Sequence, residues 1–320
     1  MRIARTLFLV SAIIGVAAGP AHAQDSTLRL VVPFPAGATL DIIGRLLAER
    51  MKATLGRPAI VENKVGAAGI IAAEHVKGAP GDGNTLLLAP LAIISLNPHT
   101  YKALRYDPFV DFAPVAHLVE FQIAIGASAS APAKTMAEYV ALVRRDSKFG
   151  FFGSAATGSL PHFFGIMIGR AAGIEMTHVP YKGTAPMIQA LAAGEISAGI
   201  STLSDVGGLA RAGKATVLAV SGPRRSPQYP EVPTLKESGF DIEATSWYAF
   251  YAPAKTRPEA LERLSRAAIE AVRAPEVAQR LEQMGLEPTG LPPSEMARIA
   301  RADYERWGPV IRAAGFAQSQ

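Results

Sequence analysis

Short apolar runs alternate with helix-like segments along most of this chain, and this alternation limits the possible folds more than any other feature. Residues 28–34 form a compact apolar run, residues 35–38 a small-residue turn, and residues 42–51 a pattern with one apolar helical face. The same order returns at residues 149–153 and 159–172. Strands separated by helices of about a dozen residues are typical of βαβ units. The sequence therefore predicts an α/β fold with a mainly parallel sheet.

The remaining elements are expected from apolar periodicity and from turn and capping residues. Strands are expected at residues 28–34, 59–62, 85–89, 121–126, 149–153, 177–180, 196–201, 216–221 and 245–252. Helices are expected up to residue 56 and over residues 66–77, 135–145, 159–172, 186–193, 234–239, 258–272, 276–284 and 294–313. Two capping boxes, residues 135–138 and 234–237, open two of these helices. The tail from residue 258 is expected to be helical, with no sheet of its own.

Two clusters of predicted strands and helices, followed by this helical tail, indicate a two-lobed α/β protein. If the tail packs back on the first cluster, the chain crosses between the lobes twice, near residues 118–125 and 244–250. The expected division is residues 24–121 plus 248–320 for lobe 1 and residues 122–247 for lobe 2. Such a hinge leaves a cleft between the lobes. One continuous sheet is equally consistent with the pattern alone.

The first 23 residues have the form of a secretory signal. Arg2 and Arg5 supply a positive start, residues 7–18 an apolar stretch short for a bilayer span, and Ala21-His22-Ala23 a cleavage site. An uncleaved membrane anchor is the alternative. We expect cleavage, a mature chain that begins at Gln24, and a soluble periplasmic protein.

Several functional classes are excluded by composition. The chain has no cysteine, so disulfides, thiolate catalysis and cysteine-based zinc sites are impossible. Its formal charge of +5 includes Arg2 and Arg5, and the remaining positive charges form no block of the kind nucleic-acid binders carry. Serine-hydrolase, dinucleotide, Walker A and zinc-protease motifs are missing, and the six histidines lack metal-ligand spacing. We expect no enzyme, no cofactor, no metal site and no nucleic-acid partner.

Two loops are the main candidates for ligand binding, because each joins a predicted strand to a helix start. Residues 35–41 are small and offer unpaired helical N–H groups, which with the helix dipole attract anions. Residues 153–162 add three hydroxyls, two glycines and His162. Ordinary capping by Thr39 and Ser159, with His162 as a structural histidine, is the alternative. An ionised Asp41 would repel an anion unless it is turned aside to brace the loop.

Further polar residues follow the later predicted strands. Tyr181, Lys182 and Gly183 repeat the strand–loop–helix order, and Lys182 either attracts an anion or is a solvated loop lysine. The stretch at residues 201–205 offers more hydroxyls after the next strand. Trp247 and Tyr248, at the second expected crossing, either line the cleft or belong to the core.

Taken in order, these loops resemble the Bug family, also called TctC-like, the periplasmic solute-binding proteins of tripartite tricarboxylate transporters. The matching stretches are Val32-Pro33-Phe34-Pro35-Ala36-Gly37 with Asp41 and Arg45, Val61-Glu62-Asn63-Lys64, Gly66-Ala67-Ala68-Gly69, Asp82-Gly83-Asn84-Thr85-Leu86, Gly153-Ser154, Gly158-Ser159 with His162, Val179-Pro180-Tyr181-Lys182-Gly183 with Ala185-Pro186, and Pro230-Glu231-Val232-Pro233-Thr234-Leu235 with Glu237 and Gly239. They cover nearly all of the mature chain, and their order is more specific than any single piece.

The resemblance implies a two-lobed receptor of the periplasmic-binding-protein (Venus-flytrap) fold. It is expected to be monomeric, to hold a small carboxylate in its cleft and to deliver it to a membrane permease. The expected ligand-binding residues are Phe34, Pro35, Ala36, Gly37, Ala38, Thr39, Asp41, Ser154, Thr157, Gly158, Ser159, His162, Tyr181, Lys182, Gly183, Ser201 and Asp205. One alternative is an exported serine hydrolase using Ser159 and His162. The other is a sensor partner that presents its ligand to a membrane kinase.

This chain departs from the family pattern at three places. Ala38 and Ala156 stand where the family usually has glycine, which narrows backbone freedom in both loops. In residues 194–201, serines occupy positions where relatives often carry aspartate. The loss of an acidic group leads to the hypothesis that amino acids are disfavoured and simple carboxylates or aromatic acids are bound.

Overall fold

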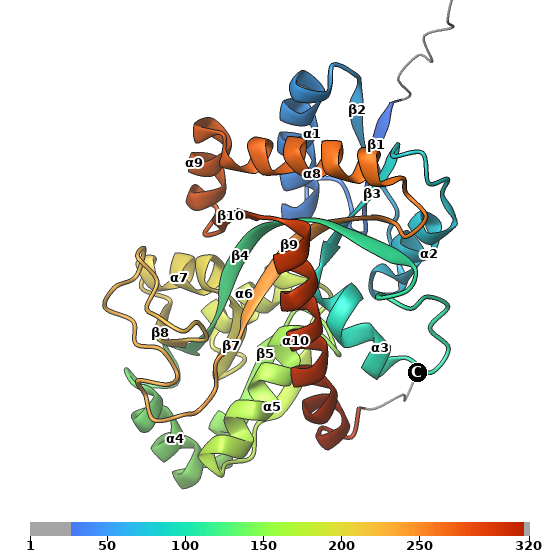
Figure 1. Cartoon of the computed structure of the whole chain (residues 1–320). Helices are drawn as coiled ribbons and strands as arrows, with labels where there is room; N and C mark the ends of the chain where they lie inside the picture. Colours follow the sequence, from blue (N-terminus) through green and yellow to red (C-terminus); the bar gives the residue numbers. More distant parts are fainter. Residues whose placement is uncertain (1–26, 317–320) are drawn as a thin grey trace, which may run out of the picture.

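The computed structural model describes residues 27–316, so the predicted secretory signal lies outside the described residues. Ten strands form one hydrogen-bonded sheet in the order β2-β1-β3-β9-β4-β7-β5-β6, with β8 and β10 pairing to β4 off this path. Figure 1 shows two groups of strands and helices, with β4 and β9 running between them. Within each group the helices lie around the strands, as the alternating sequence pattern predicts.

The first group of strands is built from the N-terminal part of the chain. β1 pairs in parallel with both β2 and β3, and β3 pairs antiparallel with β9. The bounds are Leu28–Val32 for β1, Ala59–Asn63 for β2, Thr85–Pro90 for β3 and Thr245–Pro253 for β9. Apart from the exposed Arg29, the side chains of β1 are buried, as are nearly all of those of β3, which explains their mostly apolar sequences.

The second group comes from the middle of the chain. β5 pairs in parallel with β6 and β7, while β7 and β8 pair antiparallel with β4. The bounds are Phe151–Ser154 for β5, Thr177–Pro180 for β6, Ala198–Thr202 for β7 and Ala215–Val220 for β8. Glycines pack close to neighbouring side chains here: a Cβ on Gly153 would lie 2.5 Å from Ile196.

The longest strand, β4 (Phe112–Ser128), belongs to both groups. Its first part pairs with β9 and β10 and its last part with β7 and β8. The centre of the sheet is therefore antiparallel, and the prediction of a mainly parallel sheet is wrong there. The sequence predicted only residues 121–126 of this strand because Pro114, His117 and Glu120 interrupt the apolar pattern before them.

The helices agree closely with the sequence predictions in most cases. They are α1 (Thr39–Leu55), α2 (Ile70–Gly78), α3 (Asn97–Thr100), α4 (Met136–Arg145), α5 (Leu160–Ala172), α6 (Thr184–Ala193), α7 (Leu203–Arg211), α8 (Pro258–Arg273), α9 (Pro275–Gln283) and α10 (Pro293–Ala313). Short helical turns cover Ala67–Gly69 (η1), Ala92–Leu96 (η2) and Ser147–Gly150 (η3). The predicted N-cap of α4 is confirmed, since Thr135 Oγ1 accepts the Glu138 N–H at 3.2 Å, but the Glu138 carboxylate accepts the N–H of Lys134 in place of that of Thr135.

Three sequence predictions are corrected. The tail does contribute a strand, β10 (Glu287–Leu291), whose Glu-Pro-Thr-Gly-Leu sequence has no strand pattern but pairs with β4. Helix α7 was not predicted, because residues 203–211 contain two glycines. At residues 234–237 the capping-box hydrogen bonds form, but only a turn follows, because Gly239 reverses the chain at a φ of 89°.

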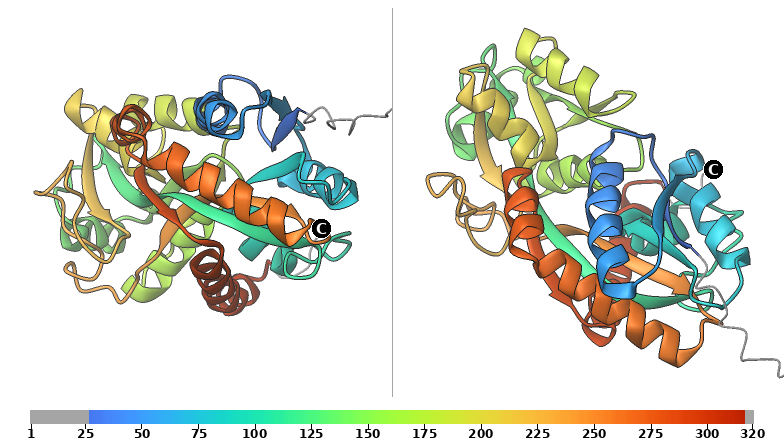
Figure 2. Two further views of the ribbon diagram at one scale, coloured as in Figure 1. Left: turned by 45° about the horizontal axis from the view of Figure 1, so that its top comes forward. Right: turned by 90° about the horizontal axis from the view of Figure 1, so that it is seen from above.

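The last helix connects the two groups. α10 packs on η2 and β4, and its Asp303 accepts a 2.8 Å hydrogen bond from the buried Trp247 indole. Trp247 is therefore a core residue. At the far end of α10, Arg170 of α5 donates to the Ala313 carbonyl, and the Phe316 ring meets the ring of Phe163 edge-on. Figure 1 shows α10 passing along the molecule from β10 toward α5, and the left view of Figure 2 shows the same helix foreshortened.

Candidate functional site

The pairing registers show that the two sets of parallel strands point toward each other. β3 runs in the same direction as β4, because each is antiparallel to β9, whereas β7 is antiparallel to β4. The end of β3 at Pro90 pairs with Tyr248, which pairs with Val119, and the end of β7 at Thr202 pairs with Ile123. Val119 and Ile123 are four residues, or about 13 Å, apart along β4. The loops that follow the strands therefore approach one another near the middle of β4.

The first loop follows β1 and is held by a buried carboxylate. Asp41, 2% exposed, accepts the Gly37 N–H at 2.9 Å and both Nε and Nη2 of Arg45 at 2.9 and 3.0 Å. Asn63 of β2 donates from one amide group to Asp41 and to the Phe34 carbonyl, each at 2.9 Å. Asp41 thus braces the loop from within.

The electrostatics of Asp41 suit a loop that meets an anion. The hydrogen bonds from Arg45, and then those from Gly37 and Asn63, outweigh the effect of burial and lower its pKa to about 2. The carboxylate is therefore ionised but surrounded by donors, which offset its charge. Gly37 has a φ of 84°, a conformation that glycine adopts without strain, and this turn places its N–H on Asp41.

The helix after this loop begins without a side-chain cap. Its N-cap is Ala38, and Thr39 is the first helical residue, so capping by Thr39 is wrong. Because alanine offers no acceptor to the first turn, the N–H groups there remain available to a ligand. Phe34, Pro35, Ala36 and Thr39 are exposed around these groups.

The second loop follows β5 and is tied to itself and to β6. Ser159 is the N-cap of α5, as predicted: its Oγ accepts the His162 N–H and donates to the Ala156 carbonyl at 2.7 Å. The buried Ser154 Oγ lies 3.2 Å from that same carbonyl and 2.8 Å from Nε2 of His178. Thr157, in contrast, is exposed.

Two histidines lie beneath this second loop. His162 Nδ1 accepts the Gly158 N–H at 3.0 Å, and the His162 and His178 rings stack with centroids 3.9 Å apart. Burial lowers the pKa of each ring to about 4, and for His178 the neighbouring His162 adds to the effect. His178 was not among the predicted site residues. It lies inside the short strand β6, and its only signal in the sequence was its position next to Val179-Pro180.

The third group of candidate residues lies against the second loop, whereas the fourth forms hydrogen bonds within itself. Tyr181 and Gly183 donate backbone N–H groups to the carbonyls of Ser154 and Ala155, at 3.0 and 2.9 Å, so the loop after β6 lies beside the loop after β5. Lys182 is exposed there. Beyond β7, Asp205 Oδ2 accepts the hydroxyls of Ser201 and Thr202, each at 2.7 Å. Tyr248 is half-buried and packs against Phe121, with ring centroids 4.9 Å apart.

The geometry does not support nucleophilic catalysis at Ser159. Its Oγ donates to the Ala156 carbonyl, while His162 Nδ1 is occupied by the Gly158 N–H. Asp205 binds Ser201 and Thr202. A serine nucleophile needs a hydrogen bond from its hydroxyl to a base that a third group orients, and these three candidates do not make that chain.

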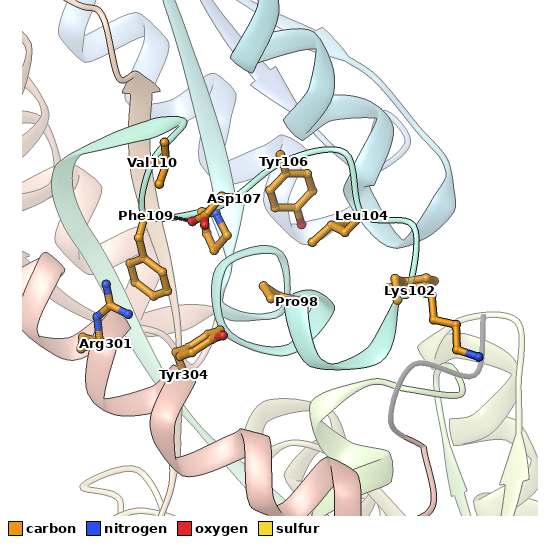
Figure 3. A pocket seen from close by; sticks show the side chains of 11 residues that line it. Pro98, Lys102, Leu104, Tyr106, Asp107, Phe109, Val110, Arg301 and Tyr304 are labelled. Atoms are coloured by element: carbon orange, nitrogen blue, oxygen red, sulfur yellow. Dashed lines mark hydrogen bonds between the residues drawn. The ribbon is translucent and has the colours of Figure 1, made fainter.

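A separate pocket of about 480 Å³ lies between the segment that follows α3 and helix α10 (Figure 3). Arg301 and Tyr304 of α10 contact Phe109 in its wall, with the Arg301 guanidinium 3.6 Å from the centre of the Phe109 ring. None of the seventeen predicted ligand-binding residues lines this pocket. In residues 27–316 no group of three or more acidic or histidine side chains is placed to hold a metal ion.

Two facing sets of strand ends, each leading through a small-residue loop into a helix, define a periplasmic-binding-protein fold of mixed α/β type. The chain belongs to the TctC family, because the model of the tripartite tricarboxylate transporter family receptor matches residues 43–316. The resemblance found in the sequence is thus confirmed. The protein is a periplasmic solute-binding receptor of this family and not an enzyme. Among residues 27–316, no helix is long and apolar enough to cross a membrane.

Three relatives are similar to this chain over nearly its whole length. Rpa4515 from R. palustris, solved with adipate, is 32% identical with a TM-score of 0.82, and the match covers 91% of this chain and 98% of that one. MatC from Rhodopseudomonas palustris, with bound malate, is 29% identical with a TM-score of 0.78 over 89% and 98%. A Cupriavidus necator protein called "UPF0065 protein in gbd 5'region" is 31% identical over 97% of this chain and 95% of its own.

Proposed function

We propose that this receptor captures a small carboxylate between the loop after β1 and the loop after β5, and hands it to the membrane permease of a tripartite transporter. The observation that carries the proposal is the opposed direction of β3 and β7, whose ends stop about four residues apart along β4. Each loop leads into a helix N-terminus, where a carboxylate is stabilised by unpaired N–H groups and the helix dipole.

The proposed lobes are residues 24–121 plus 248–320 and residues 122–247, with the hinge near residues 118–125 and 244–250. The register supports this division, because Gln122 is the last β4 residue to pair with β9 and Ile123 the first to pair with β7. Closure then requires that the ligand contact both lobes, so that the closed state gains free energy that the open state lacks.

Within the site, the exposed part of each loop meets the ligand and the buried part holds the loop. Phe34, Thr39 and the first-turn N–H groups of α1 would act from lobe 1, and Thr157 with Tyr181 and Lys182 from lobe 2. Asp41 and Asp205 serve as braces, since their oxygens accept hydrogen bonds from neighbouring loop residues.

Ligand chemistry is suggested by the relatives that hold adipate and malate. Both molecules are dicarboxylates without an ammonium group. Ser197 and Ser201, where relatives often carry aspartate, form hydrogen bonds with the Lys148 carbonyl and with Asp205 and add no charge. We therefore propose dicarboxylates rather than amino acids as the preferred class.

The test is a thermal-shift and calorimetric comparison of adipate, malate, aspartate and a neutral diamide of adipate. We expect stabilisation by one or both dicarboxylates and none by the diamide, because the helix N-termini bind the charged group. Gly37→Val should abolish the effect, whereas Gly213→Val should preserve it. Both glycines have positive φ and open space around a Cβ, so both variants strain the backbone, but only Gly37 is in a ligand loop. Equal shifts in the two variants would refute the proposal.

A further inference from the structure

The histidine pair beneath the loop after β5 has a role that capping does not explain. His178 comes from β6 and His162 from α5, and their stacked rings lie against Phe152 of β5 and Phe316 beyond α10. Each ring has a hydrogen bond to a different residue of the loop: His178 to the Ser154 side chain and His162 to the Gly158 N–H. The pair therefore joins both ends of the loop segment 154–158.

The hydrogen-bond partners allow a ring proton to be assigned to each histidine. The Gly158 N–H points to Nδ1 of His162, so this nitrogen is an acceptor and the proton is on Nε2. Ser154 Oγ lies 3.2 Å from the Ala156 carbonyl and 2.8 Å from Nε2 of His178; when its one hydroxyl hydrogen is given to the carbonyl, Ser154 accepts Nε2–H of His178. Both rings are neutral in this arrangement, in agreement with the lowering of their pKa values by burial.

We propose that His178 and His162 are positioning residues that set the shape of the second ligand loop, and that neither is a ligand contact through the nitrogen bonded to the loop. Between the two anchors, Ala156 and Thr157 are exposed and face outward. The anchors thus hold the loop in one conformation before ligand arrives, which lowers the entropy cost of binding. This inference rests on the proposed function of the loop.

The two anchors use different nitrogens, and this gives the inference a sharp test. The amide nitrogen of glutamine lies near the position of histidine Nε2, and the amide oxygen of asparagine near that of Nδ1. His178→Gln can therefore still donate to Ser154, and His162→Asn can still accept from Gly158. The exchanged variants, His178→Asn and His162→Gln, carry the same amide group on a side chain of the wrong length to place it at the ring nitrogen that bonds the loop.

Hydrogen exchange of the peptide spanning residues 151–162 is measured first, without ligand. We expect H178Q and H162N to protect this peptide nearly as the unmodified protein does, and H178N and H162Q to exchange about tenfold faster, the equivalent of one lost hydrogen bond. Equal exchange in all four variants, or faster exchange in both substitutions at each position, overturns the inference. Lost ring packing alone cannot explain slow exchange in H178Q and H162N with fast exchange in H178N and H162Q, because every variant loses the ring.

Calorimetry with adipate and malate on the same five proteins then separates the two proposals. If the unmodified protein binds neither dicarboxylate, the proposed ligand class fails, while the exchange data still decide the role of the histidines. If it binds, we expect H178N and H162Q to bind about tenfold more weakly than H178Q and H162N. Equal affinities within each position overturn the positioning role.

Discussion

Replacing Asp41 with asparagine removes the charge that braces the first ligand loop and changes the side-chain volume little. Arg45 is the largest cause of the low pKa of Asp41, and the shift from 3.8 to about 2 corresponds to about 2.5 kcal/mol at about 1.4 kcal/mol per unit. Arg45 is 56% exposed, so solvent screening reduces this value. We expect D41N to lower the free energy of unfolding by about 1–2 kcal/mol at pH 7 and to weaken dicarboxylate binding, because Gly37 is held less firmly.

Urea unfolding followed by tryptophan fluorescence gives the stability, and calorimetry gives the affinity. Because the folded pKa of Asp41 is depressed, its contribution is fully present above pH 3.8 and is lost as the pH falls toward 2. The gap between the two proteins should therefore narrow over that window. Glu49→Gln is the matched control, since Glu49 forms an exposed ion pair with Lys52 on the same helix and should change stability little. D41N and E49Q with equal stability at pH 7 would contradict the bracing role.

Two further substitutions test the interactions that hold each half of the molecule. Thr135→Ala removes the acceptor for the Glu138 N–H at the start of α4 and should cost about 1 kcal/mol in urea unfolding, and no loss would show that the cap does not stabilise this helix. Asp303→Ala leaves the buried Trp247 indole without its acceptor and should cost about 2–3 kcal/mol, measured as a lower urea midpoint with an unchanged slope. A cost below about 0.5 kcal/mol would mean that water replaces the carboxylate as the acceptor of the indole N–H.

The local structure of the two candidate loops was partly predictable because the interactions that shape it are local. The small residues before α1, the Ser159 cap of α5 and the Thr135 cap of α4 are sequence patterns that act within one helical turn. The sequence left open whether Asp41 repels an anion or braces the loop, and the bracing that the structure shows depends mainly on Arg45, four positions away. Where a residue and its partner are close in sequence, residue type and spacing carry the information.

Interactions between distant segments were not predictable in the same way. Strand β10 is a strand only because β4 provides its hydrogen bonds, and its own residues include Pro288 and Gly290. His178 matters through contacts with Ser154 and His162, in two other elements. Nothing in one sequence marks these pairings, because the partners are far apart along the chain and meet only when the sheet forms.

The shared strand β4 has a consequence for how the protein is made. An exported chain leaves the membrane N-terminus first, so residues Phe112–Ser128 reach the periplasm long before β9, which begins at Thr245. Until then one edge of an apolar strand has no partner from β9, and such an edge invites pairing with other chains. Contacts so distant along the chain also form slowly. We expect newly exported molecules to depend on periplasmic chaperones until the last third of the chain has crossed the membrane.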